Sequence, residues 1–392
     1  MTRISYLVSH PIQYFSPLFR TIAETPGIEL TVYYCHNTLV DQLVDPGFGK
    51  VIKWDIPLLQ GYRSVFLRNV SPWRSLDNRF FGLINFGIVT ALKRDKSQVV
   101  IVHGWSYFTN YLAVIASWCL GKQVWLRGEN PLNQELRKPA FLRTIKNIFL
   151  RYGLFAFVDK FLFIGKQNRS FYLHYGVRPS QLIYAPYAVD NLKLTEQASQ
   201  LVDKRGELRR HYAFREDTVV ILFAGKFIEK KRPKDVLRAA ARLTDLPIEV
   251  VMMGDGPLRD SLLESCKEMS LNSVRLTGFV NQTEIVNYYA LADIFVLPSG
   301  QGETWGLVVN EAMLFGLPVV VSETVGSADD LVVSESNGYH YPEGDIDKLA
   351  SCLRRLAEDG ARRRRAGEYS RKVVAGYSYD VMIEQILQAL KH

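Results

Sequence analysis

The feature that most constrains the fold is the alternation of short apolar runs, rich in β-branched residues, with helical stretches. Strands that alternate with helices are typical of a parallel sheet with crossover helices. The first series comprises Ile4 to Val8, Leu30 to Tyr34, Val99 to Val102, Val124 to Leu126 and Phe161 to Ile164. The second comprises Val219 to Ala224, Glu249 to Met253, Val274 to Thr277, Ile294 to Leu297 and Val319 to Val321. The sequence therefore predicts an α/β protein with two doubly wound sheets.

Two series of strands require two hydrophobic cores. A chain of 392 residues, 47% hydrophobic and 22% charged, is large and apolar enough to form both. The polar stretch Thr195 to Arg210 separates the series, so we expect domains at residues 1–190 and 191–375, followed by a closing helix at 376–392. Ligands of open α/β sheets bind at the carboxyl ends of the strands. Two such sheets facing each other would form a cleft to which both contribute.

Targeting signals and cysteine spacing indicate the compartment. Met1 to Ser9 lacks the pattern of a secretion signal, and the apolar run Tyr111 to Leu120 is shorter than the roughly 20 residues that span a bilayer. The four cysteines are widely spaced, which predicts free thiols and no structural zinc: Cys35, Cys119, Cys266 and Cys352. We expect a cytoplasmic protein.

Positive charge is concentrated in the N-terminal half. Residues 1–190 hold 22 Lys and Arg against 11 Asp and Glu, whereas the remainder holds 26 against 29. Between Arg137 and Arg169, eight bases alternate with phenylalanines and face one acid, Asp159. This pattern suits peripheral binding to the inner face of an anionic membrane, and it equally suits ordinary helices with a buried aromatic face and a solvated basic face. No nucleic-acid module accompanies the bases, so nucleic acid is not an expected partner.

The densest motif runs from Pro298 to Met313 and predicts a strand end, a glycine-rich turn and a helix. Small residues before a helix N-terminus favour phosphate binding. A carboxylate there would repel phosphate, so Glu303 is expected to face a sugar ring or its hydroxyls. Glu311 follows two helical turns later and could hold the diol of a ribose. Alternatively, the two glutamates are ordinary features of a helix.

A basic turn follows the first strand of the second series, from Gly225 to Pro233. Lys226 and Lys231 could neutralise a diphosphate leaving group, because an ammonium is a compact phosphate partner. The alternative is a solvated turn of no chemical role.

Together these motifs resemble the family-four retaining glycosyltransferases of the GT-B fold, also described as group 1. The resemblance follows the family's order and spacing through the second series. It covers Phe223 to Lys231, Met253 to Pro257, Leu276 to Phe279, Ala292 to Ser299, Gly302 to Met313, Gly316 to Val319 and Asn337 to Asp345. In the first series it is weaker and rests on Val99 to Trp105.

The resemblance implies roles for individual residues. Catalytic residues would be Glu303 beside the donor sugar, Lys231 on phosphate and His103, which ends a strand. Lys226 stands where the family usually has arginine, so the charge is kept without the bidentate fork. Other implied donor-binding residues are Glu311 on the ribose, Thr304, Trp305, Gly306, Leu307, Gly225 and Gly278.

The acceptor site is less well marked. Where the family has a paired-glycine loop, this chain has His10, Gln13 and Tyr14, whose side chains could line an acceptor pocket or simply turn the chain and fill core. Trp105 follows His103. Glu129 and Asn130 could bind acceptor hydroxyls, or Asn130 could cap a turn before Pro131.

The implied activity is a hexosyltransferase-type reaction from a UDP- or GDP-sugar to a hydroxyl of a glycan or lipid-linked saccharide, with retention at the anomeric carbon. Cell-surface polysaccharide or glycoconjugate synthesis is the expected setting. No cofactor beyond the donor is expected, and the lack of an Asp-x-Asp pair at the end of an expected strand predicts metal independence. The alternatives are a GT-B sugar-nucleotide epimerase or hydrolase and a basic nucleic-acid-binding protein.

Overall fold

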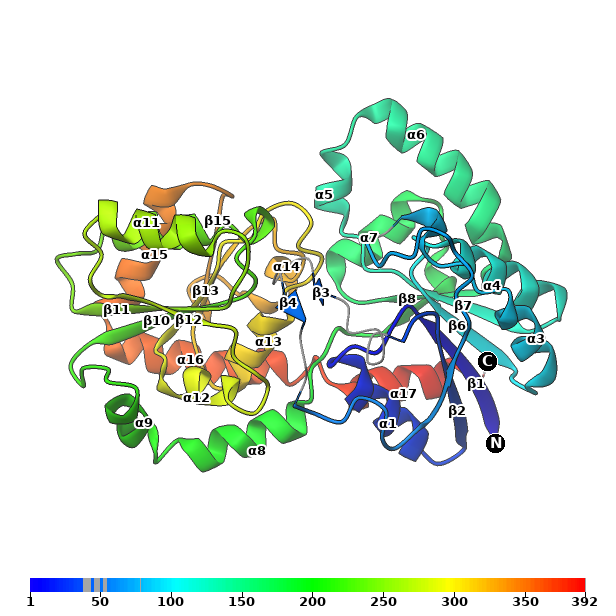
Figure 1. Cartoon of the computed structure of the whole chain (residues 1–392), viewed down its shortest axis with the longest axis horizontal. Coiled ribbons are helices and arrows are strands. Elements are labelled where there is room, and N and C mark those ends of the chain that lie inside the picture. The colour runs from blue at the N-terminus through cyan, green and yellow to red at the C-terminus, as the bar shows by residue number, and fades with distance from the viewer. Residues whose placement is uncertain (38–43, 46–49, 52–54, 78, 392) are drawn as a thin grey trace. The chain divides into compact units, whose positions relative to one another are not determined.

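The computed structural model describes residues 1–37, 44–45, 50–51, 55–77 and 79–391. The chain divides into two compact units (Figure 1). The N-terminal unit contains Met1–Leu43, Pro57–Pro186 and Tyr379–His392, and the C-terminal unit contains Val44–Ile56 and Tyr187–Ser378. The main division falls four residues before the expected boundary at 190.

The N-terminal unit is built on a parallel sheet. Its strands, in spatial order, are β5 (Arg63–Phe66), β2 (Ile28–Tyr34), β1 (Thr2–Val8), β6 (Val99–His103), β7 (Gln123–Arg127), β8 (Lys160–Phe163) and β9 (Leu182–Tyr184). Its helical segments are α1 (Phe15–Glu24), η1 (Phe80–Gly82), α3 (Gly87–Arg94), α4 (Phe108–Cys119), α5 (Leu132–Leu136), α6 (Ala140–Ile148), η2 (Phe149–Gly153), η3 (Leu154–Phe157), α7 (Lys166–His174), η4 (Pro179–Gln181) and α17 (Tyr379–Ala389).

Burial on both faces explains why the central strands are almost wholly apolar. Val100 and Val102 point into a core that includes Ile88 of α3 and Val114 of α4. The opposite face is covered by α1 and α17, which contact each other. Because helices cover both faces, the strands read as continuous apolar runs in place of an alternating pattern.

The C-terminal unit repeats this architecture. Its parallel strands, in spatial order, are β12 (Val274–Gly278), β11 (Ile248–Met253), β10 (Val219–Ala224), β13 (Ile294–Leu297), β14 (Val319–Ser322) and β15 (Gly338–Tyr341). Its helical segments are α8 (Asn191–Leu201), α9 (Arg205–His211), η5 (Glu229–Lys231), α10 (Pro233–Ala240), α11 (Arg259–Glu268), α12 (Ile285–Leu291), α13 (Leu307–Leu314), α14 (Ala328–Leu331), α15 (Ile346–Ala357) and α16 (Gly360–Val374). A short antiparallel pair, β3 (Val44–Asp45) with β4 (Lys50–Val51), belongs to the same unit.

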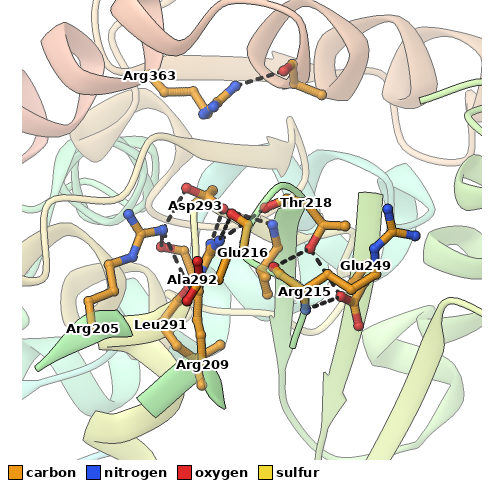
Figure 2. Close-up of polar contacts among 12 residues, drawn as sticks. Arg205, Arg209, Arg215, Glu216, Thr218, Glu249, Leu291, Ala292, Asp293 and Arg363 are labelled. Atoms are coloured by element: carbon orange, nitrogen blue, oxygen red, sulfur yellow. Dashed lines mark hydrogen bonds and ion pairs between the residues drawn. The ribbon is translucent and has the colours of Figure 1, made fainter. Parts of the chain in front are cut away.

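A buried ion cluster holds the amino ends of the central strands (Figure 2). Asp293, just before β13, accepts hydrogen bonds from Arg205 at 2.6 Å, from Arg209 and from the backbone N–H of Val220 at 2.8 Å. Burial alone would raise the pKa of Asp293, but the two guanidinium groups outweigh it and lower that pKa. The cluster ties α9 to β10 and β13.

The α/β architecture with two doubly wound parallel sheets is confirmed. Every expected strand is present, and β5, β9 and β15 are additional edge strands. The C-terminal helix α17 packs into the N-terminal unit, where the Tyr379 hydroxyl donates to the carbonyl of Tyr14 at 2.8 Å and Arg127 Nη1 donates to Met382 Sδ at 3.4 Å.

Candidate functional site

The turn between β13 and α13 is the centre of the candidate site. Gly302 and Gly306 adopt φ values of +97° and +87°, which favour glycine. The N–H of Gly326 donates to the carbonyl of Glu303 at 3.1 Å, and a Cβ at Gly326 would lie 1.8 Å from the carbonyl oxygen of Thr304. The turn is therefore held closely against the segment that follows β14.

Glu303 lies in this turn and is 6% exposed. Lys231 donates from Nζ to Glu303 Oε2. Burial would raise the pKa of the Glu303 carboxyl, but the ammonium groups of Lys231 and Lys230 outweigh burial and lower it below its usual value. Glu303 is thus an ionised carboxylate at neutral pH, unsuited to act as a general acid.

The basic turn after β10 supplies the cations of this group. Lys231 lies in η5, and a Cβ at Gly225 would lie 3.6 Å from its Cδ, so the lysine stem packs over Gly225. Lys230 donates from Nζ to the carbonyl of Gly302 at 3.2 Å. Lys226 is close enough to lower the pKa of Lys230, although burial is the main cause of that shift. Two ammonium groups, those of Lys231 and Lys230, therefore lie beside Glu303, and that of Lys226 lies near Lys230.

Three glycines bring the carboxyl ends of neighbouring strands together beside Lys231. The N–H of Gly225 donates to Met253 O at 2.9 Å, and the N–H of Gly254 donates to Gly278 O at 3.1 Å. A Cβ at Gly254 would lie 1.8 Å from the carbonyl oxygen of Gly225. Glycine leaves this strand edge without side chains, which permits close approach by a flat or anionic ligand.

Glu311 lies within α13, is 2% exposed, and accepts a hydrogen bond at 2.7 Å from the hydroxyl of Tyr289 on α12. The helix begins at Leu307, with Gly306 as its N-cap. The expectation that Glu311 follows Glu303 by two helical turns is therefore wrong. The two carboxylates come from a turn and a helix, because the positive φ of Gly306 delays the helix start.

The side chain of Trp305 is part of the core of the C-terminal unit. The indole is 2% exposed, donates from Nε1 to Asn310 Oδ1 at 2.9 Å and contacts the rings of Tyr187 and Tyr377. Leu307 is buried as well. Of the implied donor-binding residues in this turn, Trp305 and Leu307 can offer a ligand their backbone groups, while their side chains anchor the turn.

The N-terminal unit places His103 at the carboxyl end of β6. Its Nε2 donates to Glu129 Oε1 at 3.0 Å, and its ring meets the edge of Phe15 with centroids 4.7 Å apart. Nδ1 is buried without a hydrogen-bond partner among the residues that the structure describes. His103 and Glu129 are thereby brought together.

The other expected acceptor residues are distributed along the same strand ends. His10 Nδ1 lies 2.9 Å from the hydroxyl of Ser9, and Gln13 and Tyr14 lie between β1 and α1. Trp105 stacks on Phe171 with centroids 6.0 Å apart, so its ring belongs largely to the core. The carbonyl of Asn130 accepts from Asn168 at 3.0 Å.

Two residues of the candidate site were not singled out from the sequence. Lys230 was one base in a charged run, and its contact with Gly302 depends on how two distant turns meet. Tyr289 belongs to a helix of ordinary composition and carries no sequence signal. Among the described residues, no group of three or more His, Cys, Asp or Glu side chains could hold a metal ion.

Comparison with known proteins decides the family of the C-terminal unit. The family model described as glycosyl transferases group 1 matches residues 204–373. Residues 204–373 are a glycosyl transferases group 1 domain. The matched range contains the two glutamates, the three lysines and the three glycines described above.

Relatives support the group 1 assignment. An uncharacterized glycosyltransferase of Methanocaldococcus jannaschii is 30% identical over 193 residues, which cover 48% of this chain and 49% of that protein. A D-inositol 3-phosphate glycosyltransferase of Thermobifida fusca is 30% identical over 230 residues, covering 56% and 51% respectively. The chain thus spans about half the length of the curated relatives it matches.

Solved structures show the fold of the whole chain. A glycosyltransferase of Rickettsia africae matches with a TM-score of 0.76 at 14% identity, covering 100% of this chain and 98% of that one. The Anabaena protein HepE, in complex with UDP and glucose, matches with a TM-score of 0.71 at 16% identity, covering 100% of both chains. The group 1 domain thus belongs to a chain of the GT-B fold.

Proposed function

We propose that this protein transfers a sugar from a nucleoside-diphosphate sugar to a hydroxyl of a glycan or lipid-linked saccharide, with retention at the anomeric carbon. The observation that carries the proposal is the buried contact of Lys231 with Glu303, beside Lys230, at a glycine-lined strand edge. This arrangement combines a carboxylate suited to sugar hydroxyls with a surplus of ammonium groups suited to a diphosphate.

The lysines would act on the leaving group. Breaking the bond between the anomeric carbon and the donor phosphate leaves the electron pair and additional negative charge on the diphosphate. Lys226, Lys230 and Lys231 lie where they can stabilise that charge, and backbone N–H groups at the start of α13 can add to it. This assignment needs no metal ion.

Glu303 would orient the sugar and Glu311 the ribose. Because its pKa is lowered, Glu303 remains an acceptor for sugar hydroxyls through the reaction. Tyr289 holds Oε2 of Glu311, and because a carboxylate accepts several hydrogen bonds at once, a ribose diol could donate to Glu311 as well. The acceptor hydroxyl would attack the face that the diphosphate leaves and pass its proton to that phosphate.

In the N-terminal unit we assign His103 to the reacting sugar, with Glu129 orienting its ring through Nε2. His10, Gln13, Tyr14, Trp105 and Asn130 are the proposed acceptor-binding residues, Trp105 by its exposed edge. The relatives suit this class of reaction. The Thermobifida fusca relative is named for glycosyl transfer to an inositol phosphate, and the Anabaena structure contains UDP and glucose.

The test is a donor screen followed by product analysis. Binding of UDP, GDP and their sugars is measured by thermal shift, since a ligand stabilises the fold in proportion to its affinity. The best donor is then incubated with saccharide acceptors, and NMR of the product determines the anomeric configuration. A retained anomeric configuration, with equal rates with and without a chelator, is expected.

Incubating the donor without an acceptor distinguishes a transferase from an epimerase or hydrolase. Conversion of the donor to another sugar nucleotide, or rapid hydrolysis with no acceptor-dependent product, would identify an epimerase or hydrolase and overturn the proposal. An inverted product would overturn the retaining mechanism.

A further inference from the structure

The helical segment of residues 140–153 is formed by α6 and η2, and α6 packs with its polar side inward. We call this segment the outer helix; it lies on the outside of the N-terminal unit (Figure 1). No residue of α6 is buried. The side chains of α6 that face the protein are polar, including Lys146 and Asn147, which are partly buried, whereas Leu150 of η2 is buried in the core. An amphipathic helix in water normally buries its apolar face, so α6 is inverted.

Polar contacts attach the outer helix. Lys146 Nζ lies 2.9 Å from Glu135 Oε2 and 4.9 Å from the ring centroid of Phe171. Glu135 is 2% exposed and also accepts a hydrogen bond at 2.7 Å from the hydroxyl of Tyr175. These partners belong to α5 and α7. The inward position of Lys146 is therefore fixed by its ion pair with the buried Glu135, which Lys138 also contacts at 3.0 Å.

The face turned to solvent is apolar. Six of its large hydrophobic side chains are between 46% and 70% exposed: Phe141, Leu142, Ile145, Ile148, Phe149 and Tyr152. Positions 141, 145, 148, 149 and 152 recur at helical spacing, so they form one continuous stripe. Scattered exposed hydrophobics are normal, but a contiguous stripe marks an interaction surface.

The stripe continues over neighbouring elements through aromatic contacts. Phe149 lies 5.9 Å from Tyr111 of α4, which lies 5.3 Å from Phe80 of η1, measured between ring centroids. Further exposed hydrophobic side chains belong to η1, α3, α4 and the residue before α3: Phe81, Phe86, Val89, Ile115 and Trp118. The apolar surface is thus wider than a single helix.

Charge around the stripe identifies its occupant. Residues 136–158 contain five bases, namely Arg137, Lys138, Arg143, Lys146 and Arg151, and no acid. Bases that flank an apolar helix face are attracted to anionic lipid headgroups while the apolar side chains enter the acyl boundary. A second copy of the chain would bring its own exposed bases, Arg137 and Arg151 among them, against these, which disfavours self-association through this face.

We propose that the outer helix lies in the interface of an anionic bilayer, parallel to the membrane plane. Its stripe enters the headgroup boundary, and Arg137 and Arg151 contact lipid phosphates. None of the helices among the described residues is long and apolar enough to cross a bilayer, so the attachment is peripheral. The inverted packing has a simple use: polar contacts hold the helix to the protein while its apolar side remains available to lipid.

Vesicle binding tests this directly. The full chain is sedimented with vesicles of phosphatidylcholine alone or with phosphatidylglycerol added. We expect binding to the anionic vesicles, about tenfold or more weaker binding to the neutral ones, and weakening as salt increases. The double variant Ile145→Ser, Phe149→Ser should bind anionic vesicles at least about tenfold more weakly, because it loses two inserted side chains.

The matched control removes two exposed apolar side chains elsewhere. Leu192 and Val202 are 77% and 62% exposed in the C-terminal unit, and Leu192→Ser, Val202→Ser should bind vesicles as the unmodified chain does. Equal binding by both double variants would overturn the proposal, as would absence of binding to anionic vesicles. Dimerisation that the outer-helix variant alone abolishes, without vesicle binding, would assign the face to a second copy instead.

Discussion

Tyr289 donates a 2.7 Å hydrogen bond from its hydroxyl to Oε2 of Glu311, and both side chains are buried in the group 1 domain. Tyrosine is therefore the residue that orients the carboxylate assigned to the ribose. Replacing it tests that assignment without touching the ligand directly.

Tyr289→Phe should raise the KM for the donor about tenfold and change kcat less, because a hydrogen bond to a charged group contributes about 1.5–3 kcal/mol. Steady-state kinetics with varied donor measure the split. Tyr288→Phe, which alters the neighbouring tyrosine on α12, is the control and should leave KM unchanged. A lower kcat with an unchanged KM for the donor in Tyr289→Phe would show that Glu311 does not bind the ribose.

Glu303→Gln should lower transfer by about 100-fold or more, because the neutral amide cannot orient the sugar against the ammonium groups of Lys230 and Lys231. Binding of the nucleoside diphosphate without its sugar should be retained, since the variant keeps the lysines. Calorimetry with the nucleotide and a transfer assay measure the two quantities. The control Glu264→Gln, at an exposed position of α11, should behave like the unmodified protein. If Glu303→Gln loses nucleotide binding together with transfer, Glu303 has a structural role instead.

Gly254→Ala should destabilise the C-terminal unit by several kcal/mol, since its Cβ would lie 1.8 Å from the carbonyl oxygen of Gly225. Gly27→Ala provides the comparison: Gly27 has φ of +88° but no atom near the added Cβ, so its cost should be only about 1–2 kcal/mol. Urea unfolding followed by circular dichroism ranks the two. Equal destabilisation by the two variants would mean that the carboxyl ends of β10 and β11 move apart easily to make room for the added methyl group.

The attachment of the outer helix should depend on pH. Burial raises the pKa of Glu135, but hydrogen bonds from Lys146, Tyr175 and Lys138 outweigh it and lower the pKa to about 2. A carboxyl with a lowered folded pKa stabilises the protein above its unfolded pKa, about 4.3, and this stabilisation is lost as pH falls toward 2.

Hydrogen exchange of residues 140–153 measures this dependence. Protection of the segment should decrease between about pH 4.3 and 2, by roughly 2 kcal/mol for a buried charged hydrogen bond. Glu135→Gln should show weak protection with little pH dependence over that range. An identical pH profile in the variant would assign the attachment to other contacts.

Much of the fold followed from apolar runs, because central parallel strands must be hydrophobic on both faces. The edge strands β5 and β15 could not be predicted in this way. Arg63–Phe66 in β5 is only partly buried, and Gly338–Tyr341 in β15 is polar and aromatic, so neither stands out as a run of β-branched residues. Their places are set by pairing with neighbours that the sequence does not identify.

In the site, motifs indicated which turns would matter but not how side chains would be used. Trp305 lies within the recognised motif, yet its indole anchors the turn through Asn310. Glu303 and Lys231 were each singled out from the sequence. Their direct contact was not predicted, because it requires two turns that lie 72 residues apart in the sequence to pack against each other. The phenylalanines between Arg137 and Arg169 divide in a way that periodicity cannot predict: Phe141 and Phe149 are exposed, while Phe155 and Phe161 are buried.

The return of α17 to the N-terminal unit makes the group 1 domain an insertion within its neighbour. The ribosome synthesises Tyr379–Ala389 after the whole of the C-terminal unit, so the N-terminal core stays incomplete until this helix emerges. Ending the chain at Ser378 would remove α17 and its contacts with Tyr14 and Arg127. This truncation near residue 378 would therefore destabilise the N-terminal unit, whose sheet begins at Thr2. Folding of the first half is thereby made conditional on the arrival of the last helix.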